Sequence, residues 1–283
     1  MLFHSKVPRA RPPSQAPAAL RLRRWGKMLK TAASHLGLAV GLAASLYSSQ
    51  AAAQGTQFNC SSVYGLTNRG DIYVTDDAGN TELVRSIGNA GVNPFGVGPD
   101  GRYAYIARQS TASGPQGSVI VYDSLLDEVS SSSAAPQLQP GMSQFIAGAV
   151  NPVNGWFYIA APNTAGNAFF LYAYNPDTPA IAAVLVGRIT NIYGGNGDIA
   201  FDSSGNLYLA AGDERLPPPN NHIYRIGQVP TIEGNVDLPA TTIAELNTDR
   251  NVNSNGIAFS ANGTLLISAA PRTGGHRRRI VVY

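Results

Sequence analysis

The chain has one cysteine, Cys60, and therefore cannot form an internal disulfide. Charged residues are few, 13% of 283, and no lysine follows residue 30. The G-x-S-x-G turn of α/β-hydrolases and the H-E-x-x-H motif of zinc proteases are both missing. The main apolar run, residues 36–46, is shorter than the roughly 20 residues of a membrane-spanning helix. These absences argue against a disulfide-stapled scaffold, a membrane span and both hydrolase classes.

Residues 1–53 differ from the rest because they contain eight basic residues and no acidic residue. From Met28 the segment has a short basic start, the apolar run and small residues up to Ala53, which is the pattern of a secretory signal peptide. A twin-arginine signal in LRRWGKMLK is the alternative. The expected organisation is a spurious extension (1–27), a signal peptide cleaved near Ala53 (28–53) and one domain (54–283), secreted to the cell surface, the medium or the periplasm.

Removal of this leader changes the charge of the protein. Twelve arginines remain against seventeen acidic residues, which gives a net charge of −5. Nucleic-acid binding depends on clustered basic side chains that neutralise phosphates, and the one such cluster is residues 277–279. We therefore expect no nucleic-acid partner.

A phrase of two apolar segments separated by a polar, glycine-containing turn occurs four times. The turn glycines are 54, 50 and 58 residues apart, at Gly101, Gly155, Gly205 and Gly263. Glycine supplies the positive φ angle of tight hairpin turns, so each phrase predicts two antiparallel strands. A third β-rich segment has its tyrosine 19 to 21 residues after each glycine, and a weaker fourth segment follows in three modules.

Modules of about 50 residues with four antiparallel strands and no helical periodicity are typical of β-propeller blades. A β-sandwich is the alternative, but it would not repeat one strand order so regularly. Three further strands are expected between Ser62 and Gly88, and the last module stops after its third strand. The sequence therefore predicts an all-β fold, a β-propeller of about five to six four-stranded blades, incomplete at the C-terminus.

The phrase NSNGIAFSANGTLLIS, residues 253–268, resembles the blade phrase of lactonase-like six-bladed propellers, the gluconolactonase and strictosidine-synthase relatives. The order of phrases over residues 60–283 is more similar to secreted bacterial propeller-like domains of unassigned function. In the lactonase-like family an Asn of the NG phrase and an Asp of another blade bind a divalent metal. The resemblance implies this role for Asn255, but Gly197 stands at the Asp position, with Asp198 one residue later.

The inner strand of a blade should begin about eight residues before its turn glycine, where Asn93, Ala147, Gly197 and Asn255 stand, and Asn196 and Asp198 flank the third of these. Oxygen ligands of this kind suit calcium. The alternative is that they satisfy backbone groups where loops enter strands. The candidate metal ligands are Asn93, Asn196, Asp198 and Asn255.

The loops between second and third strands should share one face, the loop face, with the starts of the inner strands. Binding residues commonly lie on such loops. The longest is GDERLPPPNN, residues 212–221, although a solvated connection is the alternative. Its candidate ligand-binding residues are Asp213, Glu214, Arg215 and Asn220.

Two classes of function follow from these patterns. We expect a secreted or cell-surface binding module without catalytic activity, which takes a small molecule, glycan or protein on its loop face. A divalent-metal-dependent, lactonase-like hydrolase is the alternative, and a purely structural part of a larger surface protein is a third reading.

Overall fold

The computed structural model describes residues 57–59, 62–76, 80–109, 114–132, 134–212, 220–246, 252–271 and 279–282, with the backbone alone at 252–255, 269–271 and 279–282. The predicted leader and signal peptide lie outside these residues. Within them every regular element is a strand, and the strands form five sheets.

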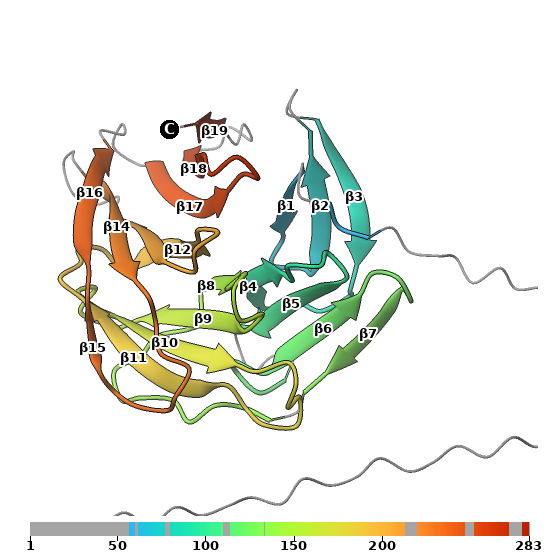
Figure 1. The fold of residues 1–283 in the computed structure, drawn as a ribbon, viewed down its shortest axis with the longest axis horizontal. Coiled ribbons are helices and arrows are strands. Elements are labelled where there is room, and N and C mark those ends of the chain that lie inside the picture. Colours follow the sequence, from blue (N-terminus) through green and yellow to red (C-terminus); the bar gives the residue numbers. More distant parts are fainter. Residues whose placement is uncertain are drawn as a thin grey trace, which may run out of the picture. The chain divides into compact units, whose positions relative to one another are not determined.

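The sheets follow one another along the chain (Figure 1). Sheet 1 contains β1 (Val63–Leu66), β2 (Asp71–Thr75) and β3 (Thr81–Ser86). Sheet 2 contains β4 (Val92–Val97), β5 (Tyr103–Arg108), β6 (Val119–Asp123) and β7 (Glu128–Ser131). Sheet 3 contains β8 (Ala147–Val150), β9 (Phe157–Pro162), β10 (Phe169–Tyr174) and β11 (Val184–Thr190). Sheet 4 contains β12 (Asn196–Phe201), β13 (Leu207–Gly212), β14 (Asn221–Gly227) and β16 (Thr241–Leu246). Sheet 5 contains β17 (Val252–Phe259), β18 (Leu265–Pro271) and β19 (Arg279–Val282).

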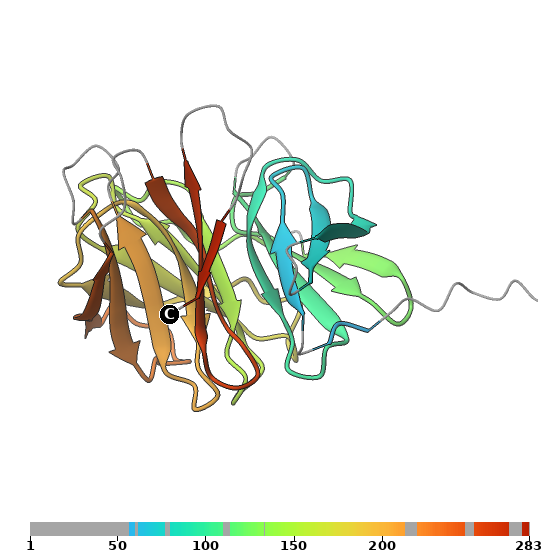
Figure 2. The same ribbon diagram turned by 90° about the horizontal axis from the view of Figure 1, so that it is seen from above.

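The strand order confirms the β-propeller prediction. Figure 1 shows the sheets along an arc from β1–β3 to β17–β19, with β4, β8 and β12 toward its middle. Each of the five sheets is built from sequential antiparallel hairpins. The innermost strands contact one another in turn, β4 with β8, β8 with β12, and β12 with β17. Figure 2 shows sheets 4 and 5 side by side at one end of the arc.

The predicted turn chemistry is also confirmed. All four turn glycines have φ between 70° and 81°. In the third module the Asp202 carboxylate accepts hydrogen bonds from the backbone N–H groups of Ser204 and Asn206, both at 2.9 Å. DSSGN is therefore an Asx-type turn in which the carboxylate caps the hairpin.

The hydrophobic cores lie between neighbouring sheets, because each strand buries its alternate side chains against the next blade. Three aromatic pairs bridge neighbouring sheets, with one ring of each pair on each of the two sheets. Their ring centroids are 5.0 to 5.9 Å apart: Tyr105 with Phe157, Tyr158 with Phe201, and Tyr208 with Phe259. Paired, buried rings of this kind contribute more to the stability of the fold than their buried surface area alone accounts for.

One strand departs from the simple blade order. β15 (Asp237–Pro239) belongs to the connection between β14 and β16 of sheet 4, yet it pairs in parallel with β11 as the fifth strand of sheet 3. Leu238 is buried over Gly187, where an added Cβ would lie 2.7 Å from the leucine Cδ1 atom. The Arg188 side chain donates to the Asp237 carboxylate at 2.8 Å. This connection therefore fastens sheets 3 and 4 together.

We expect Leu238→Ala to lower the free energy of unfolding by about 2 to 4 kcal/mol, the usual cost of emptying a packed leucine site. The matched control is Ile232→Ala in the same connection, because that side chain is 80% exposed. Urea unfolding followed by circular dichroism measures both. Equal losses of unfolding free energy in the two variants would contradict the conclusion that β15 holds sheets 3 and 4 together.

No helix in the described ranges is long and apolar enough to cross a membrane.

Candidate functional site at the start of β12

The start of β12 places two of the predicted site residues on one strand face. Asn196 and Asp198 are two residues apart in a fully paired segment opposite β13, and side chains with this spacing point to the same side of a strand. Both are partly exposed, whereas Gly197 between them is buried. An added Cβ at Gly197 would collide with the Ala210 carbonyl oxygen, which explains the glycine in this phrase.

Asp198 links three consecutive inner strands through its carboxyl group. Oδ1 accepts hydrogen bonds from the backbone N–H groups of Ile199 in β12 at 2.9 Å and of Gly148 in β8 at 3.3 Å. Oδ2 accepts from the backbone N–H of Ile257 in β17 at 3.4 Å. Both oxygens are thus engaged by backbone donors, and one side chain joins sheets 3, 4 and 5.

The same carboxyl group lies deep among its neighbours, although the residue keeps some accessible surface. Burial disfavours the charged form and raises the pKa of Asp198 to about 7, while the hydrogen bonds from Ile199, Gly148 and Ile257 act in the opposite direction. The raised pKa shows that desolvation outweighs the three donors. Asp198 can therefore exchange a proton near neutral pH.

The remaining metal candidates occupy different places. Asn93 is exposed on β4, which is separated from β12 by β8. Asn255 lies on β17 at a break in the pairing register, between Ser254 and Gly256, and its side chain is outside the described atoms. A similar break lies between Val92 and Phe95 around Asn93. Both asparagines therefore stand at β-bulges, features that commonly re-aim side chains near functional sites.

The structure brings Asp198 against the backbone of the phrase that contains Asn255, but it spreads the four candidates over three inner strands. Within the described ranges, no three His, Cys, Asp or Glu side chains gather as a metal cluster.

The predicted loop candidates divide in two. Asp213, Glu214 and Arg215 lie outside the described residues. Asn220 is fully buried, and its side-chain oxygen accepts a hydrogen bond from the Asn221 amide at 3.0 Å. Asn220 therefore belongs to the packed start of β14.

An aromatic group beside the start of β12 was not foreseen. Tyr193 is 49% exposed, and its backbone N–H donates to the Tyr224 hydroxyl at 2.9 Å. The His222 ring lies edge-on to Tyr193 at 6.3 Å and tilted to Tyr224 at 5.8 Å. The three rings come from segments about 30 residues apart, so only the pairing of β14 within sheet 4 brings them together. Tyr193 stands on the loop face, three residues before Asn196.

Comparison with known proteins gives only distant structural matches. No family model matches the sequence, and no curated protein matches it. Solved structures similar to it include the periplasmic gluconolactonase of Pseudomonas aeruginosa, with 15% identity, 78% of this chain and 66% of that chain covered, and a TM-score of 0.42. TolB of Acinetobacter baumannii has 14% identity, coverage of 77% and 49%, and a TM-score of 0.43. An auxiliary nutrient-binding protein of Bacteroides thetaiotaomicron has 12% identity, coverage of 81% and 57%, and a TM-score of 0.42.

The matches include a gluconolactonase, the kind of protein to which the sequence phrase has its distant likeness. They concern the fold alone, since one propeller architecture supports many unrelated activities.

Proposed function

We propose that this chain is a secreted, non-catalytic binding module that takes a polar ligand, such as a glycan, on the loop face beside β12. The observation that carries the proposal is the exposed Tyr193 ring, which lies edge-on to His222 and whose backbone N–H is bound by the Tyr224 hydroxyl. A fixed aromatic surface with a few polar neighbours is the usual composition of a small-ligand site. Asn196 and Asp198 supply those polar groups three and five residues later.

The hydrogen bonding of Asp198 also suits a binding role. The two oxygens of this carboxyl group accept three backbone N–H groups from three inner strands, which is a structural role, and the remaining lone pairs can accept a donor group from a ligand. The signal-peptide pattern of residues 28–53 supports secretion. An exported protein of this kind meets glycans and other polar ligands outside the cytoplasm.

We expect Tyr193→Ala to weaken ligand binding about tenfold or more, because exposed aromatic anchors carry much of the affinity at such sites. Isothermal titration calorimetry with a panel of neutral and acidic oligosaccharides measures the effect. Ile232→Ala is the matched control, since it removes an exposed apolar side chain from the connection between β14 and β16. Unchanged affinity in Tyr193→Ala would move the binding site elsewhere.

The lactonase-like alternative has one observation in its favour. The β17 phrase with Asn255 approaches Asp198 through the Ile257 amide, so a carboxylate and an asparagine phrase lie near each other. Under this alternative, gluconolactone hydrolysis should depend on added calcium and should be lost in Asp198→Ala. Under the proposed function, the rate of gluconolactone hydrolysis in the presence of the protein is the same with calcium as with EDTA.

A further inference from the structure

A second concave site lies at the opposite ends of the strands from the start of β12. It is a cavity of about 230 Å³ between sheets 2 and 3. Its walls come from the turn between β4 and β5, the turn between β8 and β9, and the connection after β10. Antiparallel strands place these connections at one end and the loop face at the other. This site, the turn-side cleft, is therefore separate from the proposed glycan face.

The inner wall of the cleft is a buried tyrosine. Tyr105 is only 6% exposed, and its ring is fixed against Phe157 at 5.9 Å and Tyr174 at 6.4 Å. Its hydroxyl oxygen is not one of the fully buried, unpartnered polar atoms of the described residues, and Tyr105 lines the cleft, so this oxygen is open to it. Burial, and then the nearby Asp100 carboxylate, raise the pKa of Tyr105 to about 12. The phenol therefore stays protonated beside the cleft, with oxygen lone pairs free to accept.

Two exposed carboxylates complete the cleft, Asp100 from sheet 2 and Asp177 from sheet 3. Neither forms an ion pair with a described residue. Asp100 is fixed because its Oδ1 atom accepts a hydrogen bond from the Arg102 backbone N–H at 3.0 Å. Two negative charges thus face a 230 Å³ space with no basic side chain in its lining.

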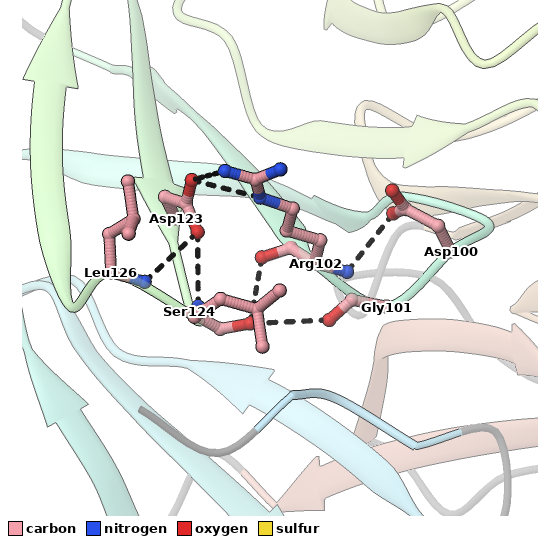
Figure 3. Close-up of polar contacts among 7 residues, drawn as sticks. Asp100, Gly101, Arg102, Asp123, Ser124 and Leu126 are labelled. Atoms are coloured by element: carbon pink, nitrogen blue, oxygen red, sulfur yellow. Dashed lines mark hydrogen bonds and ion pairs between the residues drawn. The ribbon is translucent and has the colours of Figure 1, made fainter. Parts of the chain in front are cut away.

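Arg102, the basic residue next to Asp100 in the sequence, is bound to Asp123, as Figure 3 shows. The Arg102 guanidinium donates from Nε at 3.0 Å and from Nη2 at 2.7 Å to the Asp123 carboxylate. Asp123 is fixed in turn by the backbone N–H groups of Leu125 and Leu126 at 3.0 and 3.2 Å. The Ser124 hydroxyl donates to the Arg102 carbonyl at 2.8 Å. Arg102 is therefore paired with Asp123, with Asp100 acting on it only as a weaker, longer-range charge, and neither Asp100 nor Asp177 has an ion-pair partner among the described residues.

The aromatic lining selects among possible cations. The Arg102 guanidinium lies 4.8 Å from the centroid of the Tyr103 ring, so this wall already makes one cation–π contact. Pro99 and Pro176 add apolar surface. Two carboxylates alone are few for a hard metal ion, which takes six or more oxygens. Three oxygen acceptors with apolar walls match a primary ammonium group, which has three donors and no acceptor, on a short alkyl chain.

We propose that the turn-side cleft binds a small organic cation, with its ammonium group between Asp100, Asp177 and the Tyr105 hydroxyl and its alkyl part against Tyr103. Ion pairs with both carboxylates and a hydrogen bond to the phenol hold the charged end. The proline and tyrosine surfaces cover the apolar end.

The test is a titration with n-butylammonium, n-butanol and butyrate, three probes of matched length that differ in charge. Chemical shifts of the tyrosine ring signals, followed by NMR, report binding at this cleft. We expect saturable shifts with butylammonium alone. Asp177→Asn and Asp100→Asn should each weaken binding about tenfold, because each removes one charge-assisted hydrogen bond. Asp100→Asn keeps an oxygen for the Arg102 N–H and therefore preserves the turn.

Glu82→Gln is the control, since it removes the same charge from an exposed position on β3 and should leave the affinity unchanged. Tyr105→Phe keeps the packed ring and should weaken binding less than either aspartate change. Equal shifts with butanol and butylammonium, or an affinity indifferent to Asp177→Asn, would overturn the proposal. Loss of oligosaccharide binding in Tyr193→Ala leaves this titration untouched, so the two sites are tested independently.

Discussion

The free energy of unfolding should fall by up to about 4 kcal/mol as pH rises from 4 to 7, because the pKa of Asp198 is about 7 in the folded protein and 3.8 without the fold. A raised aspartate pKa means that the folded protein binds the proton more tightly than the unfolded chain. The contribution is therefore complete below pH 3.8 and is lost as pH rises through 7. The difference is about three pKa units at about 1.4 kcal/mol each.

Other shifted carboxyl groups act in a different pH window. The pKa of Asp123 is lowered chiefly by its hydrogen bond from the Arg102 side chain. Burial alone would raise the pKa of Asp202, but hydrogen bonds from the Asn206 side chain and from the turn backbone outweigh it, so this pKa is lowered as well. Their contributions to stability are present above their unfolded pKa values near 3.8 and are lost as pH falls below that range. The slope between pH 4 and 7 therefore reports on Asp198.

The decisive variant is Asp198→Asn, which removes the charge and keeps one oxygen for Gly148 and Ile199. It should remove the pH dependence of stability between pH 4 and 7. At pH 8 the loss of the buried charge is offset in part, because the amide NH2 group then faces the Ile257 N–H donor. Asp237→Asn, an exposed change on β15, is the control and should leave the slope in place. Urea unfolding at half-unit pH steps measures all three proteins. A slope that persists in Asp198→Asn would contradict the account.

Gly148→Ala should cost about 3 kcal/mol, at the upper end of the range for overpacking a close contact. An added Cβ would lie 2.7 Å from the Phe95 backbone nitrogen and 2.8 Å from the Pro94 Cβ atom. Backbone atoms cannot rotate away, so β4 and β8 would have to separate.

Gly65→Ala is the matched control, because it places the same methyl group in the interior of β1 with no atom within 4 Å. We expect it to change stability by less than about 0.5 kcal/mol. Chemical denaturation of both variants gives the comparison. Similar losses in the two variants would show that the cost comes from strand glycine in general and not from the approach of β4 to β8.

The turn glycines made the fold predictable from the sequence. Gly101 and its three counterparts stand at positive φ, which glycine adopts without strain, so their spacing indicates the blade repeat. β15 could not be predicted from the sequence, because three residues carry no alternating pattern and because their partner strand, β11, comes from a different module of the chain. Local patterns locate strands within a module, but they do not say which connection crosses to a neighbouring one.

The candidate site was predictable only in part, for a similar reason. Asp198 was identified from its place before a turn, but its hydrogen bonds to Gly148 and Ile257 depend on how three inner strands align across blades. Tyr193 and His222 meet only because β14 pairs within sheet 4. Asn220 looked like a loop ligand, yet it is buried, because the loop ends where β14 begins.

The central claim is that Asp198 holds the inner strands together in a binding propeller and does not serve a catalytic metal. Thermal melting of the purified wild-type protein and Asp198→Asn, by circular dichroism in calcium and then in EDTA, tests this most directly. The account predicts cooperative transitions whose midpoints do not respond to calcium in either protein. A midpoint that calcium raises by several degrees in the wild type, but not in Asp198→Asn, would contradict it and would establish a metal site at the start of β12.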